Sequence, residues 1–323
     1  MRRWLEHAWY GSRAPLLLRP LARMHARLKR DREQPPRATP PVPVIVVGNL
    51  VVGGSGKTPV VAALAGAIAA TGRRVAILSR GYGGRGQDQP LRVQSGHTAA
   101  EVGDEPLELY RRTGVPVWVG RRRAAALESA LAAGAQVIIS DDGLQHAALP
   151  RSFEICVIDG KRGFGNGWLL PAGPLRESTD RLASVDLVLI KQTDGNEAPN
   201  LPAGSRFRLE AGALQPVGSD AQAAPPEPPA VIDAVAGIAD PERMFAELAA
   251  RGYTVRRHPL ADHQAIDPDW LARLPGPVIL TAKDRARLPD TGLRSDLFVL
   301  PVTARLPDAA VDRVLAHVRE WLP

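Results

Sequence analysis

The chain has 323 residues, 45% of them apolar, which is enough to bury one large domain or two smaller ones. Its 41 basic and 34 acidic residues give a net charge of +7, which suits an anionic partner. The single cysteine, Cys156, excludes an internal disulfide and a multi-cysteine zinc site, and the sequence has no membrane-spanning run or cleavable signal. We therefore expect a globular protein of a reducing cytoplasm.

Residues 1–40 form a basic segment with a helical pattern. Apolar residues recur three or four positions apart, and arginines occupy the other side: Leu17, Leu21, Met24 and Leu28 against Arg19, Arg23, Arg27 and Arg30. Such a helix, with Trp4 and Trp9 nearby, can lie in a membrane interface. It can equally pack on the protein's own core, since surface helices share this pattern.

After a proline-rich link ending at Pro43, an apolar strand at 44–48 runs into a glycine-rich turn that ends in Gly56-Lys57-Thr58. A helix is predicted at 59–71. This order predicts a phosphate-binding loop, with nucleotide contacts at Val51, Val52, Gly53, Gly54, Ser55, Gly56, Lys57 and Thr58. Val51 stands where the usual pattern has glycine, so an ordinary strand-to-helix turn with an exposed lysine is the alternative.

The remaining pattern alternates strands with helices, which predicts an α/β fold with a parallel sheet and helices on both faces. Strands are expected at 75–79, 115–119, 136–140, 154–159 and 186–191, and helices at 105–112 and 121–133. We expect a nucleotide-binding domain like those of phosphate-loop NTPases over 41–200, a linker or hairpin over 201–230, and a smaller α/β domain over 231–323. Strands at 231–236, 253–258, 277–281 and 297–301 and helices at 241–251 and 309–321 belong to this last domain.

Several polar residues follow predicted strands. Asp141 and Asp142 end an apolar strand, where a carboxylate near the phosphate loop can hold Mg²⁺; two solvated loop aspartates are the alternative. Asp104 is a candidate general base, although it can instead cap the helix that follows. Asp262-His263 in the smaller domain offers a histidine able to tune that base across the domain cleft, while most such histidines are surface residues.

Arg176 and Glu177 lie on a loop that can shape a phosphate or metal site, or they can simply pair with each other at the surface.

Together these motifs resemble the tetraacyldisaccharide 4′-kinase family, the lipid A 4′-kinases of Gram-negative bacteria. The matching segments run in order from about residue 42 to 290: Val47-Gly-Asn-Leu50, Val52-Gly-Gly-Ser-Gly-Lys-Thr-Pro59, Leu78-Ser-Arg-Gly-Tyr-Gly-Gly84, Val102-Gly-Asp-Glu-Pro106, Asp141-Asp-Gly-Leu-Gln-His146, Leu170-Pro-Ala-Gly-Pro-Leu-Arg-Glu177, Gly237-Ile-Ala-Asp-Pro-Glu-Arg243 and Asp262-His263. The chain departs from the family pattern at Gln264, where a second histidine is common, and at Ala282, where glutamate is common.

The resemblance implies transfer of the γ-phosphate of ATP to the 4′-hydroxyl of an acylated glucosamine disaccharide 1-phosphate, by a peripheral enzyme at the cytoplasmic face of the inner membrane. It implies that Lys57 holds the triphosphate and that Asp104 accepts the hydroxyl proton with help from His263. Mg²⁺ would be served by Thr58, Asp141 or Asp142, and Glu177. The substrate and phosphate surroundings would include Asn49, Arg80, Gln145, His146 and Arg176.

A partner-regulated NTPase of the GTPase or metallochaperone type is the alternative. A guanine-reading Asn-Lys-x-Asp motif is absent, because Lys191-Gln-Thr-Asp194 has the wrong spacing and Thr281-Ala-Lys-Asp284 the wrong order. A third interpretation is an ATPase that uses its arginines only to tether itself to a membrane or nucleic acid. We expect a lipid substrate and the membrane surface as partners, with no nucleic acid and no obligate protein partner.

Overall fold

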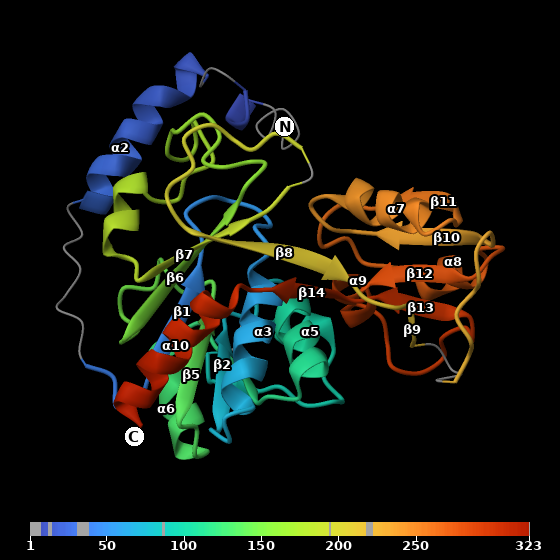
Figure 1. Ribbon diagram of the computed structural model, residues 1–323, viewed down its shortest axis with the longest axis horizontal. Coiled ribbons are helices and arrows are strands. Elements are labelled where there is room, and N and C mark those ends of the chain that lie inside the picture. Colours follow the sequence, from blue (N-terminus) through green and yellow to red (C-terminus); the bar gives the residue numbers. More distant parts are fainter. Residues whose placement is uncertain are drawn as a thin grey trace. The chain divides into compact units, whose positions relative to one another are not determined.

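The computed structural model describes residues 8–11, 15–30, 39–85, 88–193, 195–217 and 222–322. Predictions that fall on Trp4, on the proline-rich link at 34–38 and on Asp194 lie outside the described residues. The chain forms two compact units (Figure 1). Unit 1 comprises Met1–Leu78, Leu127–Leu209 and Ala304–Pro323, and unit 2 comprises Ser79–Ala126 and Glu210–Thr303.

Unit 1 is built on a parallel sheet in which β1 lies between β5 and β6. The strands follow the order β8-β7-β6-β1-β5-β2, with β14 beside β8. Their bounds are β1 Val44–Gly48, β2 Val75–Ser79, β5 Val137–Asp141, β6 Phe153–Asp159, β7 Leu187–Lys191, β8 Ser205–Ala211 and β14 Val302–Arg305. Every residue of β1, β2, β5 and β6 is buried, as the apolar runs of strands covered on both faces require.

Helix α3 packs on β1 and β5, and the terminal helix α10 packs against α3 (Figure 1). Residues four positions apart on α10, namely Ala310, Val314 and Val318, are buried in this contact layer. The helices associated with unit 1 are η1 Leu16–Leu18, α2 Arg19–Arg30, α3 Lys57–Ala69, α6 Arg123–Ala132, η2 Thr179–Ser184 and α10 Asp308–Trp321.

Helix α2 has two different faces. Ala22 is buried with Ala172, beside Leu18 and Trp168, and the guanidinium groups of Arg19 and Arg23 lie over the Trp168 ring. On the other side, Leu16, Leu17, Leu21 and Met24 are exposed, Leu17 to 90%. Packing on the protein's own core thus accounts for the Ala22 face, while contact of the exposed face with a membrane stays a prediction. Among the helices that the structure describes, none has both the length and the apolar character needed to cross a bilayer.

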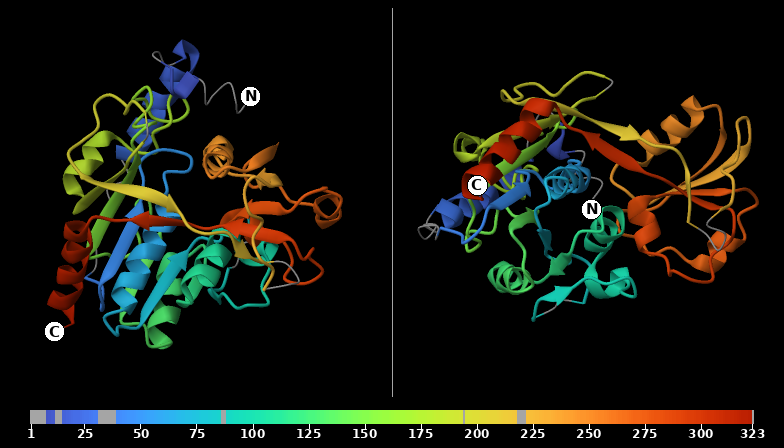
Figure 2. Two further views of the ribbon diagram at one scale, coloured as in Figure 1. Left: turned by 45° about the vertical axis from the view of Figure 1, so that its right-hand side comes forward. Right: turned by 60° about the horizontal axis from the view of Figure 1, so that its bottom comes forward.

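Unit 2 contains a second, smaller sheet, whose strands are drawn in yellow to red in Figure 2. Its order is β11-β10-β12-β13-β9, and only β9 runs antiparallel to its neighbour. Its strands are β9 Gln215–Pro216, β10 Val231–Ala236, β11 Thr254–Pro259, β12 Val278–Thr281 and β13 Leu297–Leu300, with helices α7 Pro241–Ala250, α8 Pro268–Ala272 and α9 Ala282–Ala286. The first segment of unit 2, Ser79–Ala126, adds β3 Leu91–Arg92, α4 Ala99–Val102, α5 Asp104–Thr113 and β4 Val117–Val119. Helix α5 packs against α9, which fixes the start of α5 within this unit.

The compact units differ from the predicted division. The segment expected as a linker or hairpin contains β8, which pairs with β7, and β9, which pairs with β13, so its two strands join different sheets. Phe207 is buried between the exposed Arg206 and Arg208, and this alternation is typical of a strand with one covered face. Helix α10 belongs to unit 1 because its apolar face is covered by α3.

The core of unit 2 supports a stability prediction. Phe245 on α7 is fully buried with Leu248, Ile279 and Phe298. We expect Phe245→Ala to lower the free energy of unfolding by about 3–5 kcal/mol, because it removes buried apolar area and leaves a cavity. Urea denaturation measures the loss. Glu242→Ala on the same helix is the control and is expected to cost less than about 1 kcal/mol, since its pair with Arg257 is exposed; equal losses would contradict this packing.

Candidate active site

The turn between β1 and α3 has the backbone of an anion-binding loop. Gly53 and Gly56 have φ angles of 107° and 86°, values that side chains disfavour, and Gly56 immediately precedes the first residue of α3. Among the described residues, the amide N–H groups of Gly53 to Gly56 have no hydrogen-bond acceptor, and the buried Ser55 hydroxyl also has none. Unpaired donors at a helix N-terminus fit the phosphates of a nucleotide.

Lys57 is the first residue of α3, and its ammonium lies 3.4 Å from the carboxylate of Asp142. Arg176 contacts the same carboxylate at 2.9 Å. Burial alone would raise the pKa of Asp142, but the charges of Lys57 and Arg176 outweigh it and hold the pKa at about 2. Asp142 is therefore an anion that fixes two cations beside the phosphate loop.

The loop at 170–177 is held against the residues that enter the phosphate loop. Val51 and Leu175 form an antiparallel bridge, the amide of Val52 donates to Pro174, and the amide of Arg176 donates to Leu50. This pairing explains why Val51 is 5% exposed and tolerated where glycine is usual, since the backbone here is extended and paired rather than curled.

Gln145 connects several of the predicted residues of unit 1. Its Nε2 donates to the Asn49 carbonyl at 3.0 Å and to the Glu177 carboxylate at 3.3 Å, and its Oε1 accepts from Arg176 at 3.3 Å. Arg176 and Glu177 thus bind neighbours on other segments, which differs from a simple surface pair. The half-buried His146 is fixed through its amide, which donates to Gly143.

The oxygen donors proposed for Mg²⁺ come from three segments that pack together in unit 1. Thr58 lies in the first turn of α3, the 2%-exposed Asp141 ends β5, and Glu177 ends the loop at 170–177. No group of three or more metal-ligating side chains forms in the part of the chain that the structure describes. This arrangement is compatible with Mg²⁺, which typically takes one or two carboxylates and completes its shell with phosphates and water.

Lys191 and Asp159 form an ion pair at the same edge of the sheet. This ion pair was not predicted from the sequence. The Lys191 ammonium lies 2.5 Å from Asp159, whose other oxygen accepts from the amides of Lys161 and Arg162. A Cβ atom on Gly56 would lie 3.5 Å from the Lys191 side chain, so this lysine runs directly beneath the phosphate loop. The only available signal was that both residues end apolar strands.

In unit 2, a glycine-rich turn after β2 determines where Asp104 lies. A Cβ atom on Gly84 would come within 2.8 Å of the Glu101 carbonyl, and one on Gly103 within 2.7 Å of the Tyr82 carbonyl. The two backbones can approach this closely only because both positions are glycine. The following residue, Asp104, begins α5 and is 5% exposed.

The Asp104 carboxylate is held on both oxygens. One oxygen accepts from the Glu105 amide, and the other contacts His263 Nδ1 at 2.9 Å and the Arg287 guanidinium at 2.9 and 3.0 Å. Burial would raise the pKa of Asp104, but the His263 hydrogen bond and the charges of Lys283, His263 and Arg287 outweigh it and hold the pKa at about 2. Asp104 is the first helical residue rather than the cap, which is Gly103.

Arg287 and Lys283 were not predicted from the sequence, although both lie in or beside α9. Arg287 also binds Asp284 at 3.0 Å, and Asp284 in turn accepts from the Gly237 amide. The Lys283 ammonium lies 3.0 Å from Asp262 and 3.3 Å from His263 Nε2. A signal was available in Thr281-Ala-Lys-Asp284, because threonine and aspartate at this spacing predict a helix start.

These contacts assign the tautomer of His263. A lysine ammonium can only donate, so Nε2 must accept from Lys283 and Nδ1 must carry the proton that is donated to Asp104. The His263 ring also meets the edge of the Tyr82 ring, with centroids 5.6 Å apart. The exposed Arg80 lies just before this tyrosine, at the end of β2.

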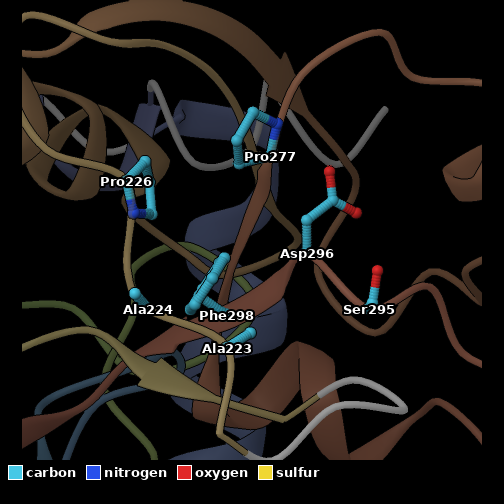
Figure 3. Close-up of a pocket in the computed structure, with 7 residues that line it drawn as sticks. All are labelled: Ala223, Ala224, Pro226, Pro277, Ser295, Asp296 and Phe298. Carbon is cyan, nitrogen blue, oxygen red and sulfur yellow. The ribbon is translucent and has the colours of Figure 1, made fainter.

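A shallow pocket elsewhere in unit 2 lacks such chemistry. Figure 3 shows its lining residues, which are Ala223, Ala224, Pro226, Pro277, Ser295, Asp296 and Phe298. Asp296 is bound by Arg294 at 2.6 Å. The lining therefore offers no acid–base pair such as Asp104 and His263.

The Asp104 pKa has a consequence for stability at low pH. The folded value of about 2 lies below the ordinary value of 3.8, so ionised Asp104 stabilises the fold above pH 3.8, and this contribution is lost as the pH falls toward 2. We expect Asp104→Asn to weaken the pH dependence of unfolding by about 2 kcal/mol over this range. Urea titrations between pH 2 and 5 measure it. Glu108, whose pKa burial raises to about 7, titrates outside this window; an unchanged pH dependence would contradict the ion pair.

Comparisons with known proteins show the family of the chain. Residues 14–319 match the family model for tetraacyldisaccharide-1-P 4′-kinase. A tetraacyldisaccharide 4′-kinase of Alkalilimnicola ehrlichii is 48% identical over 98% of this chain and 93% of its own length. One from Alcanivorax borkumensis is 42% identical over 97% of this chain and 96% of its own length.

The fold also has a solved counterpart. A crystal structure of LpxK from Aquifex aeolicus in complex with ATP superposes with a TM-score of 0.76 at 26% identity, covering 94% of this chain and 98% of that one. The predicted α/β class and the predicted family are thereby confirmed, and the regulatory-NTPase alternative is set aside. The chain therefore belongs to the tetraacyldisaccharide-1-P 4′-kinase family, and it is a kinase of lipid A biosynthesis.

Proposed function

We propose that the chain transfers the γ-phosphate of ATP to the 4′-hydroxyl of a tetraacylated glucosamine disaccharide 1-phosphate, with the phosphate loop binding the nucleotide and the Asp104–His263 pair supplying the base. The observation that carries this proposal is the hydrogen-bonded pair of Asp104 and His263. A phosphate loop is common to many NTPases, whereas a histidine oriented by a buried carboxylate is suited to taking a proton from an acceptor hydroxyl.

The unpaired amides at Gly53 to Gly56 and the Lys57 ammonium support binding of the triphosphate. The relative from Aquifex aeolicus was solved in complex with ATP. Thr58, Asp141 or Asp142, and Glu177 are the proposed oxygen ligands for Mg²⁺, which when bound neutralises phosphate charge. Asp142 is the less available of the two aspartates, because Lys57 and Arg176 already occupy its carboxylate.

The proposed base is His263, and Asp104 holds it in place. The sequence-based prediction instead made Asp104 the base and gave His263 the assisting role. A carboxylate whose pKa is about 2 is a weak base, and Asp104 is buried, whereas the His263 side chain is 31% exposed. The acceptor O–H gives its proton to Nε2 of His263 as the new O–P bond forms and the bond to the ADP oxygen breaks. Asp104 stabilises the resulting imidazolium through Nδ1.

Five further residues are proposed to surround the substrate or phosphates: Asn49, Arg80, Gln145, His146 and Arg176. Gln145 and Arg176 are joined by a hydrogen bond near Asp142, while Arg80 is exposed in unit 2 next to Tyr82. Positioning and charge neutralisation are the main demands of phosphoryl transfer, which suits cationic and amide side chains at these places.

We also propose that the protein acts as a peripheral enzyme at the cytoplasmic face of the inner membrane. A substrate with four acyl chains stays in a bilayer. The exposed residues Leu17, Leu21 and Met24 of η1 and α2 give an apolar surface for the acyl region, and the nearby arginines suit anionic headgroups.

The kinase activity is tested by transfer of γ-³²P from ATP to the tetraacylated disaccharide 1-phosphate in detergent micelles. We expect labelled lipid from the wild type and at least about a 10³-fold loss in Lys57→Ala, Asp104→Ala and His263→Ala. Lys57→Ala should also weaken MgATP binding, while Asp104→Ala and His263→Ala should retain it, because only Lys57 belongs to the phosphate loop.

The exposed Arg313→Ala on α10 is the control and should keep full activity. Folded, ATP-binding wild-type protein that hydrolyses ATP but labels no lipid would contradict the proposal and favour a partner-regulated NTPase.

The membrane role is tested by co-sedimentation with vesicles that contain anionic lipid. The combined variant Leu17→Ser, Leu21→Ser and Met24→Ser is expected to lower vesicle binding about tenfold and to raise the apparent KM for lipid while leaving the KM for ATP unchanged, because the acyl-facing surface is lost. Val231→Ser, another exposed apolar position, is the control. Equal changes in both KM values would argue against membrane docking by this helix.

A further inference from the structure

We infer that Lys283 is a further catalytic residue, whose ammonium group donates to the oxygen of the acceptor hydroxyl and to the phosphoryl group being transferred to it. This inference rests on the proposed function. The Lys283 ammonium is partly buried and lies beside the Asp104–His263 pair.

His263 can accept a proton at only one of its two ring nitrogens. Its Nδ1–H is committed to Asp104, so only the Nε2 lone pair can accept the hydroxyl proton. That lone pair faces the Lys283 ammonium at 3.3 Å. Because Nε2 has a single lone pair, an acceptor hydroxyl that donates to it takes the place of the Lys283 N–H. The hydroxyl oxygen then lies beside the displaced ammonium, which can donate to it.

Negative charge develops on the acceptor oxygen during the transfer. As the proton leaves, negative charge grows on the acceptor oxygen and on the phosphoryl oxygens bonded to it, and a fixed cation stabilises this charge more than it stabilises the neutral hydroxyl. Lys283 is suited to this role because its side chain is 17% exposed, so that solvent screens its charge only weakly.

The Lys283 ammonium is held in place by carboxylates and by the α9 backbone. Asp262 accepts from Lys283 at 3.0 Å and Glu105 lies 3.9 Å away, while the α9 backbone that carries Lys283 is fixed by the Thr281–Asp284 start of the helix and by Arg287. Two carboxylates thus hold the Lys283 ammonium beside Nε2 of His263, which lies 3.3 Å away. Arg287 is a positioning residue, since it contacts both Asp104 and Asp284.

The role of Lys283 is tested by side chains of nearly lysine length that differ in charge. Lys283→Cys gives the chain a second thiol, in addition to that of the single native cysteine, Cys156. Cys156 is fully buried, and burial raises its pKa to about 12, so the native thiol is protected from alkylation. Alkylation with 2-bromoethylamine then restores an ammonium group of nearly lysine length. Alkylation with iodoacetamide gives a neutral group of similar size and serves as the matched control.

We expect Lys283→Cys to lower kcat for phosphorylation of the tetraacylated disaccharide about 10²–10³-fold with little change in MgATP affinity. The aminoethylated protein should regain at least about tenfold in kcat, and the carboxamidomethylated protein should not. Equal kcat values for the two alkylated forms, or a kcat within about threefold of wild type for Lys283→Met, would overturn the inference. Absence of lipid phosphorylation by the wild type would instead defeat the proposed function, so the two failures are distinguishable.

Discussion

Removing a carboxylate from water costs several kcal/mol unless a cation or hydrogen-bond donors replace its hydration, and both units of this protein are organised around that constraint. In unit 1, Asp142 is matched by Lys57 and Arg176, and Asp159 by Lys191. In unit 2, Asp104 and Asp284 share Arg287. Each pair ties the end of one strand or helix to another segment, so these charges fix the backbone of the candidate site.

The same constraint separates the chemical roles of neighbouring residues. The pKa of Asp104 is held at about 2 because the residue is matched by an arginine and a histidine. A carboxylate in that state orients its partner better than it accepts a proton, and its partner here is the more exposed His263. The second cation of this cluster is Lys283, which contacts Asp262, Glu105 and Nε2 of His263.

Much of the fold was predictable because apolar periodicity and turn residues act locally. The strands at 44–48 and 75–79 and the helix that begins at the phosphate loop were predicted within two residues. In the segment at 201–230, the loop-like composition does not indicate that β8 and β9 pair with strands of different sheets, because those strands are distant in sequence. Likewise, the amphipathic pattern of α10 indicates that one face is covered, but it cannot indicate that α3 covers it.

By itself, the sequence determined the phosphate loop, the alternation of strands and helices, and the residue types of the site, because these depend on local backbone chemistry and on short motifs. Only the tertiary structure decided which charges meet. Arg287 is 183 residues from Asp104 along the chain, and no local pattern links them. It also decided that α2 packs one face on Trp168 and exposes the other, because the covering residues are distant in sequence and the hydrophobic effect is non-directional.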